Sequence, residues 1–240
     1  MTLLFFATCG LEDYPHIYPI AQSNVTTEFN YRATVYIPNA NSSTEFTHLL
    51  IFYRIYVSNS PQSAPTPGVF STINPVLAQD YNSISPYIDS DTLVNTNMDG
   101  LFSGRGYKYL SLAGHNIEDV LSKDPSPYPN ILGKTLIFDF PTGLDPTLTI
   151  DGAVYTLWRS NGNGTFSPEP DRLFRNKNDL WDPAKINSPI NADVVDFTTG
   201  TIATHYTFAA MFIVAAGLDQ NTWSYIYSTP SLIHVFQLQN

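Results

Sequence analysis

Two stretches of the chain are apolar on both faces, and they predict its most deeply buried strands. The first spans residues 48–58 and is apolar on both faces apart from Arg54, and the second spans residues 206–216. Apolar side chains on both faces are typical of strands at the centre of a sheet, where neither face meets water. We therefore expect residues 49–57 and 206–214 to pair side by side.

Shorter strands are predicted by the alternation of apolar and polar side chains. Residues 31–37 alternate with a period of two, which is typical of a strand that is buried on one face. In the second half of the chain, Asp151-Gly152 lies between two such segments and is a strong signal for a two-residue hairpin turn. The further strands predicted in this half are residues 135–140, 148–150, 153–159 and 232–238.

Loops and a short helix separate these strands. Residues 59–75 are rich in Ser, Pro, Asn and Gly, which mark a long loop. Asn116 is expected to cap a short helix over residues 116–121, and residues 217–221 are expected to form a turn. With 18 Pro, 13 Gly, 15 Tyr and 15 Phe but 13% charged residues, the composition favours short strands over helical bundles. The sequence predicts an all-β fold with one domain over residues 31–240.

Two blocks of the chain resemble parts of a fibronectin type III domain, an immunoglobulin-like antiparallel sandwich. Residues 52–59 (Phe-Tyr-Arg-Ile-Tyr-Val-Ser-Asn) resemble its middle strand, and residues 206–217 with residues 227–230 (Tyr-Ser-Thr-Pro) resemble its last two strands. The resemblance covers about a quarter of the chain. It implies that the middle and penultimate strands are antiparallel neighbours, with residues 232–238 on the other side of the penultimate strand. The long separation of the blocks makes residues 60–196 an expected insertion, folded as a separate lobe or a cap.

Cys9 is the only cysteine of the chain, and it directly follows the short apolar run of residues 3–8. Bacterial lipoproteins carry their lipid-modified cysteine after such a run, and residues 6–10 (Phe-Ala-Thr-Cys-Gly) resemble a relaxed lipobox. We therefore expect residues 1–9 to be the remnant of a longer signal sequence and residues 10–30 to be a poorly packed tether. A buried, unmodified cysteine is the alternative.

The leader also contributes to a second resemblance. Together with residues 51–56, 157–160 and 166–171, it is similar to uncharacterised lipoproteins of spirochaetes such as treponemes. The resemblance implies a protein of the bacterial cell envelope that faces the periplasm or the outer surface and is attached to the membrane through a lipid on Cys9. It implies no catalytic residue.

The charge and the motifs of the chain argue against several functions. The formal net charge is −10, and binding to phosphates requires clustered Lys and Arg, so we expect no nucleic-acid partner. The longest apolar run, residues 208–218, is shorter than the roughly 20 residues of a membrane-spanning helix. The sequence contains no nucleophile-elbow, P-loop or dinucleotide-binding motif, and its five histidines lack the spacing of a zinc site. We expect no cofactor and no catalytic residue, and the absence of these motifs favours a protein that is not an enzyme.

Two loops carry weak signals for ligand binding. Residues 103–106 (Ser-Gly-Arg-Gly) are a weak signal for an anion site, because so short a glycine pair is most often a turn. The other loop copies the first half of an EF-hand calcium loop, but Gly106 stands where the bidentate glutamate would be, and no helices are expected around it. A solvated turn is the alternative, and we expect at best weak calcium binding. The oxygen ligands concerned are Asp89, Asp91, Asn95, Asn97 and Asp99.

Aromatic side chains supply the remaining candidate site. Trp158, Trp181 and Trp223 are weak candidates for a platform on which sugars stack. Large aromatic side chains also fill the cores of β-sandwiches, and this interpretation is favoured. The sequence therefore predicts a non-enzymatic binding or structural protein of the cell surface with a protein or glycan ligand. A carbohydrate-binding module or a glycoside-active protein is the alternative.

Overall fold

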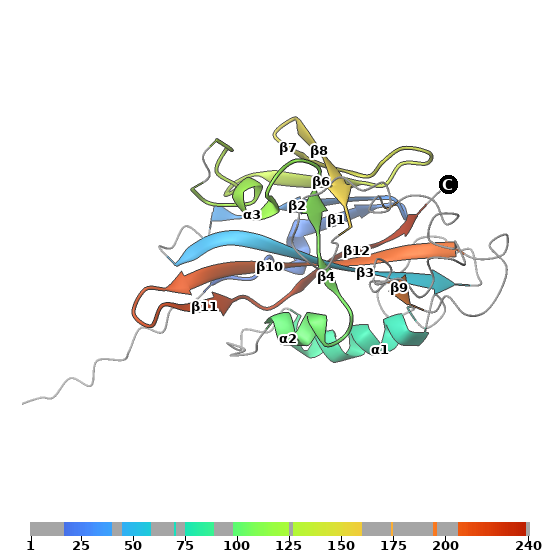
Figure 1. Ribbon diagram of the computed structural model, residues 1–240, viewed down its shortest axis with the longest axis horizontal. Coiled ribbons are helices and arrows are strands. Elements are labelled where there is room, and N and C mark those ends of the chain that lie inside the picture. The colour runs from blue at the N-terminus through green and yellow to red at the C-terminus, as the bar shows by residue number, and fades with distance from the viewer. Residues whose placement is uncertain are drawn as a thin grey trace, which may run out of the picture.

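The protein folds into two antiparallel β-sheets, one of which is curled into a half-barrel, with a few short helices (Figure 1). The mostly β character predicted from the sequence is therefore confirmed. The computed structural model describes residues 17–39, 45–58, 70, 75–88, 98–124, 127–159, 174, 194–195 and 206–238.

The first sheet is built from six strands in the order β1-β2-β6-β7-β8-β5, each antiparallel to its neighbours. The alternation predicted for β2 is confirmed, because Ala33 and Val35 are fully buried and Tyr36 is exposed. Asp151 and Gly152 both have positive φ, as a two-residue hairpin turn requires. The strands are β1 (Val25–Glu28), β2 (Arg32–Tyr36), β5 (Ser111–Leu112), β6 (Thr135–Asp139), β7 (Thr147–Ile150) and β8 (Ala153–Trp158).

The second sheet is organised around the two apolar strands, β3 (Phe46–Ser58) and β10 (Tyr206–Asp219). They pair antiparallel over almost their full length, and β12 (Ser231–Leu238) pairs with the other side of β10. Both pairings were predicted from the sequence and are confirmed. The remaining members are β11 (Ser224–Tyr227), which pairs with the end of β10, β4 (Lys108–Tyr109), and β9 (Val194–Val195), which pairs parallel with β3.

The turn expected at residues 217–221 begins later, because β10 continues to Asp219 and pairs there with β11. Gly217 is required inside this strand by close packing. A Cβ atom at this position would lie 2.2 Å from the carbonyl oxygen of Glu45 and 2.3 Å from Cδ1 of Ile17. The glycine therefore marks a close approach of two backbones rather than the end of the strand.

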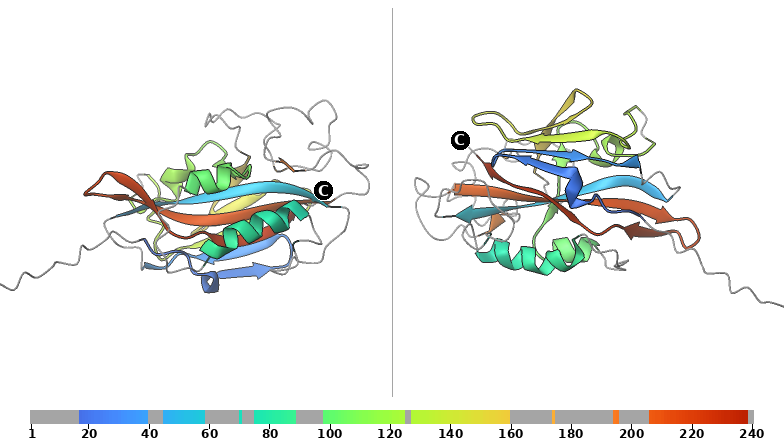
Figure 2. Two further views of the ribbon diagram at one scale, coloured as in Figure 1. Left: turned by 90° about the horizontal axis from the view of Figure 1, so that it is seen from below. Right: turned by 180° about the vertical axis from the view of Figure 1, so that it is seen from behind.

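Two hydrophobic cores explain why β3 is apolar on both faces. Leu49, Ile51 and Tyr53 pack in a core between the two sheets, whereas Leu50 and Phe52 pack in a second core on the other face of the second sheet. Figures 1 and 2 show helices lying along this other face. They are α1 (Pro75–Ile84), followed by the 3-10 turn η4 (Ser85–Tyr87), and α2 (Met98–Ser103). The two shorter helical segments of the described chain are η1 (Gln22–Asn24) and α3 (Ile117–Val120).

The expected tether over residues 10–30 is wrong for residues 17–30. Ile17 and Ile20 are buried in the core between the sheets, and β1 pairs with β2 along its whole length. Two hydrogen bonds fix the segment to β12, one from the Ser231 hydroxyl to the carbonyl of Ile20 and one of 3.0 Å from the Gln22 amide to the carbonyl of Leu232. Isolated apolar anchors give no periodicity, so the sequence pattern did not detect this packing.

Residues 60–196 were expected to fold as a separate lobe or as a cap on the sheet, and the separate lobe is wrong for the described residues of this segment. Strand β6 pairs with β2 over five residues, and β7, β8 and β5 continue the same sheet. Pairing on both edges of β2 is favoured because the strand is buried on one face and its backbone N–H and C=O groups need hydrogen-bond partners. The described strands of this segment are therefore integral to the sandwich, and its helices α1 and α2 cover one face of the second sheet.

Candidate functional site

Most residues of the candidate calcium site lie outside the described part of the chain, namely Asp89, Asp91, Asn95 and Asn97. Asp99 is the second residue of helix α2, so the expectation that no helix lies near this loop is wrong. Because α1 also precedes the loop, helices flank it on both sides. The expectation of weak calcium binding stays a prediction.

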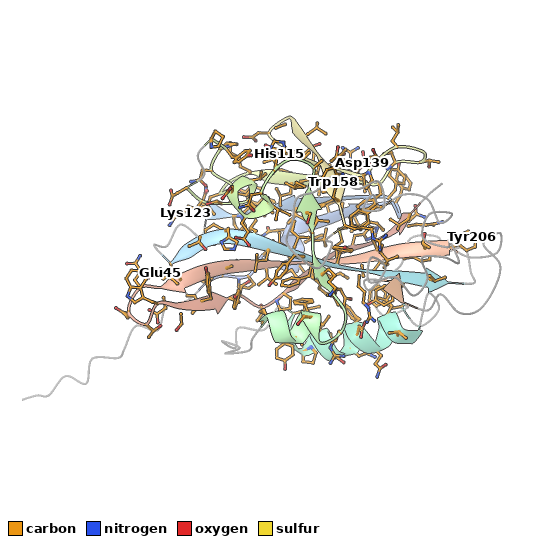
Figure 3. All side chains as sticks on the ribbon, viewed as in Figure 1. Glu45, His115, Lys123, Asp139, Trp158 and Tyr206 are labelled. Carbon is orange, nitrogen blue, oxygen red and sulfur yellow. The ribbon has the colours of Figure 1, made fainter. Side chains whose placement is uncertain are left out.

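The aromatic candidates are separated in the structure. Trp158 is half-buried on β8 of the first sheet (Figure 3). Trp223 lies in the turn between β10 and β11 of the second sheet. Trp181 lies outside the described residues, as does Cys9. Trp158 and Trp223 therefore do not form one sugar-binding platform, and Trp223 has to be considered with its own neighbours.

The end of the β10–β11 hairpin exposes two aromatic side chains. The hairpin projects beyond the rest of the described chain, as the views from three sides agree (Figures 1 and 2). Trp223 is 76% exposed and Tyr225 is 65% exposed, and the Tyr225 ring stacks on Tyr227 at 6.3 Å between centroids. Single exposed apolar side chains are common, so the informative feature is that two large aromatic side chains are exposed together at the end of one hairpin.

Hydrogen bonds hold the turn that carries Trp223 in a strained conformation. Trp223 has φ of 57°, a left-handed conformation that costs a non-glycine residue on the order of 1 kcal/mol. The Trp223 amide donates to the carbonyl of Asp219 at 2.8 Å, and the Asp219 carboxylate accepts from the Asn221 amide at 2.8 Å and from the Thr222 hydroxyl at 2.6 Å. The hydrogen bond from Thr222, followed by that from Asn221, lowers the pKa of Asp219. The turn thus holds a bulky aromatic residue where glycine would be less strained.

A buried polar cluster lies between β3 and α1, on the face of the second sheet that is turned away from the first sheet. We call it the Arg54 cluster, and its members are Arg54, Tyr56, Asp80, Arg105 and Tyr107. Asp80 Oδ2 lies 2.6 Å from Nη1 of Arg54 and 2.6 Å from the Tyr56 hydroxyl. Asp80 Oδ1 lies 3.7 Å from Nη1 of Arg105, and the hydroxyl oxygens of Tyr56 and Tyr107 are 2.9 Å apart. The Arg54 guanidinium also lies 5.6 Å from the centroid of the Tyr56 ring, within cation–π distance.

The direction of the hydrogen bonds in the Arg54 cluster follows from the fact that each tyrosine hydroxyl has one proton to donate. An ionised carboxylate can only accept, so Tyr56 donates its one hydroxyl proton to Asp80. The bond between the two tyrosines must then be donated by Tyr107. Burial is the largest cause that raises the pKa of Tyr56 and of Tyr107, so both phenols are neutral at physiological pH.

Part of the Arg54 cluster was visible in the sequence. Arg54 interrupts an otherwise apolar strand, and a charged side chain on a buried face requires a partner of opposite charge. The partner, Asp80, was missed because the residues of α1 showed no clear period. The turn expected at residues 103–106 is confirmed, since the Gly106 amide donates to the carbonyl of Ser103 at 2.9 Å.

Two histidines lie in the described strands, His48 on β3 and His234 on β12. His234 is buried on β12, and its Nε2 donates to the carbonyl of Phe29 at 2.8 Å. Burial lowers the pKa of His234, and burial is also the main cause of the lowered pKa of His48 on β3. His115 contacts the Tyr128 hydroxyl at 2.9 Å through Nδ1, and packs edge-on against Tyr155.

Acidification is expected to destabilise the protein through these histidines. The pKa of His234 in the folded state lies below the unfolded value of about 6.5, so the unfolded chain binds more protons between the two pKa values. Stability is therefore lost as the pH falls below about 6.5, and the loss levels off below the folded pKa. Urea denaturation between pH 7.5 and pH 5 should show this fall. A His234→Asn variant should show a shallower fall, and an unchanged slope would contradict the assignment.

Neither a metal centre nor a membrane-spanning helix is found in the described part of the chain. No three His, Cys, Asp or Glu side chains among these residues are grouped so that they could hold a metal ion. No helix among them is long and apolar enough to cross a bilayer. Comparison with known proteins adds no assignment, since no family model, no curated protein and no solved structure matches the chain.

Proposed function

We propose that the protein is a non-enzymatic binding protein of the bacterial cell envelope, anchored by a lipid on Cys9. The anchor is supported by the apolar run of residues 3–8 directly before Cys9. The binding role is supported by the rigid β-scaffold and by the aromatic end of the β10–β11 hairpin. The protein would face the periplasm or the outer surface and present the hairpin to a protein or glycan ligand.

The projection of the β10–β11 hairpin with two exposed aromatic side chains, Trp223 and Tyr225, is the observation that carries the binding role (Figures 1 and 2). Tryptophan presents a large apolar area with few rotatable bonds, so it loses little entropy when it docks. Backbone strain of this kind costs stability and persists where the surroundings or a function maintain it. Because the hairpin projects from the sandwich, a ligand can reach Trp223 and Tyr225 without a change in the fold.

The binding role is tested with the full chain carrying Cys9→Ser, so that no lipid contributes to attachment. We expect this protein to bind isolated bacterial envelopes saturably and Trp223→Asn to weaken the affinity about tenfold or more, as loss of an aromatic hot spot does. Phe29→Asn is the matched control, because Phe29 is 70% exposed and has φ of 56° in the β1–β2 turn. Asparagine tolerates the left-handed conformation, so both variants should fold. Equal binding by the two variants would remove the hairpin from the proposal.

Carbohydrate binding is the second candidate, and the exposed rings of Trp223 and Tyr225 are the observation that favours it. Sugar rings stack on such aromatic faces through their apolar C–H surfaces. A glycan array probed with the Cys9→Ser protein should then give signals that Trp223→Asn abolishes and Phe29→Asn leaves intact. An array without any signal would exclude this candidate and leave a protein ligand.

We also propose that the second sheet follows the strand order of a fibronectin type III domain. In this assignment β3 is the middle strand, β10 is the penultimate strand and β12 is the last strand. The antiparallel pairing of β10 with both others supports the assignment. Superposition of a crystal structure on fibronectin type III domains tests it, since a match of these strands to any other three would refute it.

A further inference from the structure

The described part of the chain begins beside the β10–β11 hairpin. Ile17 is its first residue, and a Cβ atom at Gly217 would lie 2.3 Å from Cδ1 of Ile17. Gly217 lies two positions before Asp219, the last residue of β10, which corresponds to about 7 Å along the strand. The Trp223 amide donates to the carbonyl of Asp219, so Trp223 lies at the same end of β10. Ile17 and the exposed aromatic side chains of the hairpin therefore share one end of the molecule.

The reach of the chain between Cys9 and Ile17 limits which end of the molecule can face a bilayer that holds a lipid on Cys9. Ile17 follows Cys9 by eight residues, and a segment of this length spans at most about 26–29 Å. The first residue of β10, Tyr206, precedes Gly217 by 11 residues, or about 36 Å of strand. Figure 3 shows Tyr206 and Glu45 at opposite ends of the molecule, with Glu45 at the hairpin end.

Only one of these two ends fits that reach. With the Tyr206 end against the bilayer, Ile17 would stand about 36 Å above the lipid surface, which exceeds the span of eight residues. With the hairpin end against the bilayer, Ile17 would stand within about 7–10 Å of the tip, well inside that span. An anchor on Cys9 therefore turns the hairpin toward the bilayer.

The tip of the hairpin has the chemistry of a surface that meets a neutral lipid–water interface. Residues 220–225 (Gln-Asn-Thr-Trp-Ser-Tyr) are all exposed, and none of them is charged. Trp and Tyr combine an apolar ring with a polar N–H or O–H group, and both gather in proteins at the level of the lipid headgroups. Residues 216–230 contain no Lys or Arg, so the hairpin has no cation with which to attract anionic headgroups.

We propose that the tip of the hairpin, with Trp223 and Tyr225, inserts at the lipid–water interface of the bilayer that holds Cys9. The proposal rests on the lipid anchor of the proposed function, and it names the lipid surface, rather than a protein or glycan, as the partner of the hairpin. Two aromatic side chains bind a bilayer weakly by themselves, but the link to Cys9 keeps them at a high effective concentration beside it. The two contacts orient the sandwich with its Tyr206 end away from the bilayer.

The test supplies the lipid chemically, so it does not depend on lipid modification by bacteria. The full chain is coupled through Cys9, its only thiol, to a maleimide lipid in phosphatidylcholine vesicles. Brominated acyl chains, which quench tryptophan fluorescence on contact, should quench up to about one third of the signal, because Trp223 is one of three tryptophans. Trp223→Asn should remove this quenching. Low and high salt should give the same quenching, because the tip has no charge to be screened.

Phe29→Trp in the Trp223→Asn background is the matched control. Phe29 is 70% exposed with φ of 56°, close to the 76% and 57° of Trp223. Its carbonyl accepts from Nε2 of His234, and His234 pairs with Met211 in the half of β10 that lies away from the hairpin. A tryptophan at position 29 should therefore stay unquenched by the brominated lipid.

The outcomes separate the membrane contact from the anchor. A Cys9 thiol that did not react with the maleimide lipid would be inaccessible, and this result would overturn both. Three results with the coupled protein would overturn the membrane contact alone: no quenching that depends on Trp223, quenching that is lost at high salt, or equal quenching of a tryptophan at position 29. The hairpin would then be left for the protein or glycan ligand.

Discussion

Replacing Asp80 by alanine is expected to lower the free energy of unfolding by about 3–5 kcal/mol, the usual cost of removing one partner from a buried ion pair. Asp80 is the only carboxylate that contacts Arg54 and Arg105 in the described structure, and it also accepts from the hydroxyl of Tyr56. Without it, the Arg54 guanidinium and the Tyr56 phenol would lose the acceptor that they share, and the partly exposed Arg105 would lose a nearby opposite charge. Guanidinium denaturation of the wild type and of Asp80→Ala measures the difference.

Asp151→Asn is the matched control for this experiment, because asparagine also tolerates the left-handed backbone of residue 151. Asp151 forms an ion pair with Lys134, but both side chains are substantially exposed, so water replaces the lost interaction. We expect a loss of less than about 1 kcal/mol, as is usual for surface ion pairs. Similar losses for Asp80→Ala and Asp151→Asn would contradict the account of the Arg54 cluster as a buried and interdependent network.

The second large effect is expected from Phe212→Ala, at about 3–5 kcal/mol of lost stability. Phe212 is fully buried in the middle of β10, in the core between the second sheet and helices α1 and α2. Its ring lies 5.5 Å from the ring of Phe102 and 5.7 Å from the ring of Tyr107. Alanine would leave a cavity among these side chains that the rigid sheet cannot close. Urea denaturation measures the loss.

Phe29→Ala controls for the loss of an aromatic side chain as such. Phe29 is exposed and stacks on Tyr31 at 5.5 Å between ring centroids, so its removal opens no cavity. We expect this variant to lose far less stability than Phe212→Ala. If Phe212→Ala unfolded no more readily than Phe29→Ala, the second core would not be a packed part of the native fold.

The pairing of the two long strands of the second sheet could be predicted because the apolar pattern within each strand shows that it is central in a sheet. Residues 49–57 and 206–214 are apolar on both faces, so each requires cover on two sides and a neighbouring strand on each edge. Few arrangements meet these requirements for both strands except direct pairing. The separation of about 150 residues is no obstacle, because the entropy of closing a loop grows slowly with its length.

The first sheet and helix α1 could not be predicted to the same extent. Strand β2 pairs with β1 on one edge and with β6 on the other. The alternation of its side chains specifies which face is buried but does not specify its neighbours. The packing of residues 17–30 depends on Ile17, Ile20 and a few hydrogen bonds, which leave no periodic pattern. The pattern of apolar residues indicates which face of a strand is buried, whereas the contacts of residues 17–30 depend on the complete fold.

The candidate sites were predictable in part for the same reason. Arg54 stood out as a charge in an apolar strand, but its counterpart Asp80 lies on a helix that the pattern did not indicate. Trp223 was one of three aromatic candidates, and its exposure follows from the extension of β10 to Asp219, which moves the turn to residues 220–223. A turn at residues 217–221 would have placed Trp223 in a strand instead.

The lipid anchor on Cys9 is the central claim about function, and metabolic labelling tests it most directly. Bacteria that express the wild type or Cys9→Ser are grown with an alkyne analogue of palmitate, and the label on the purified chain is quantified. The account predicts strong labelling of the wild type and none of Cys9→Ser, because Cys9 is the only thiol of the chain. An unlabelled wild type, or equal label on both proteins, would contradict it.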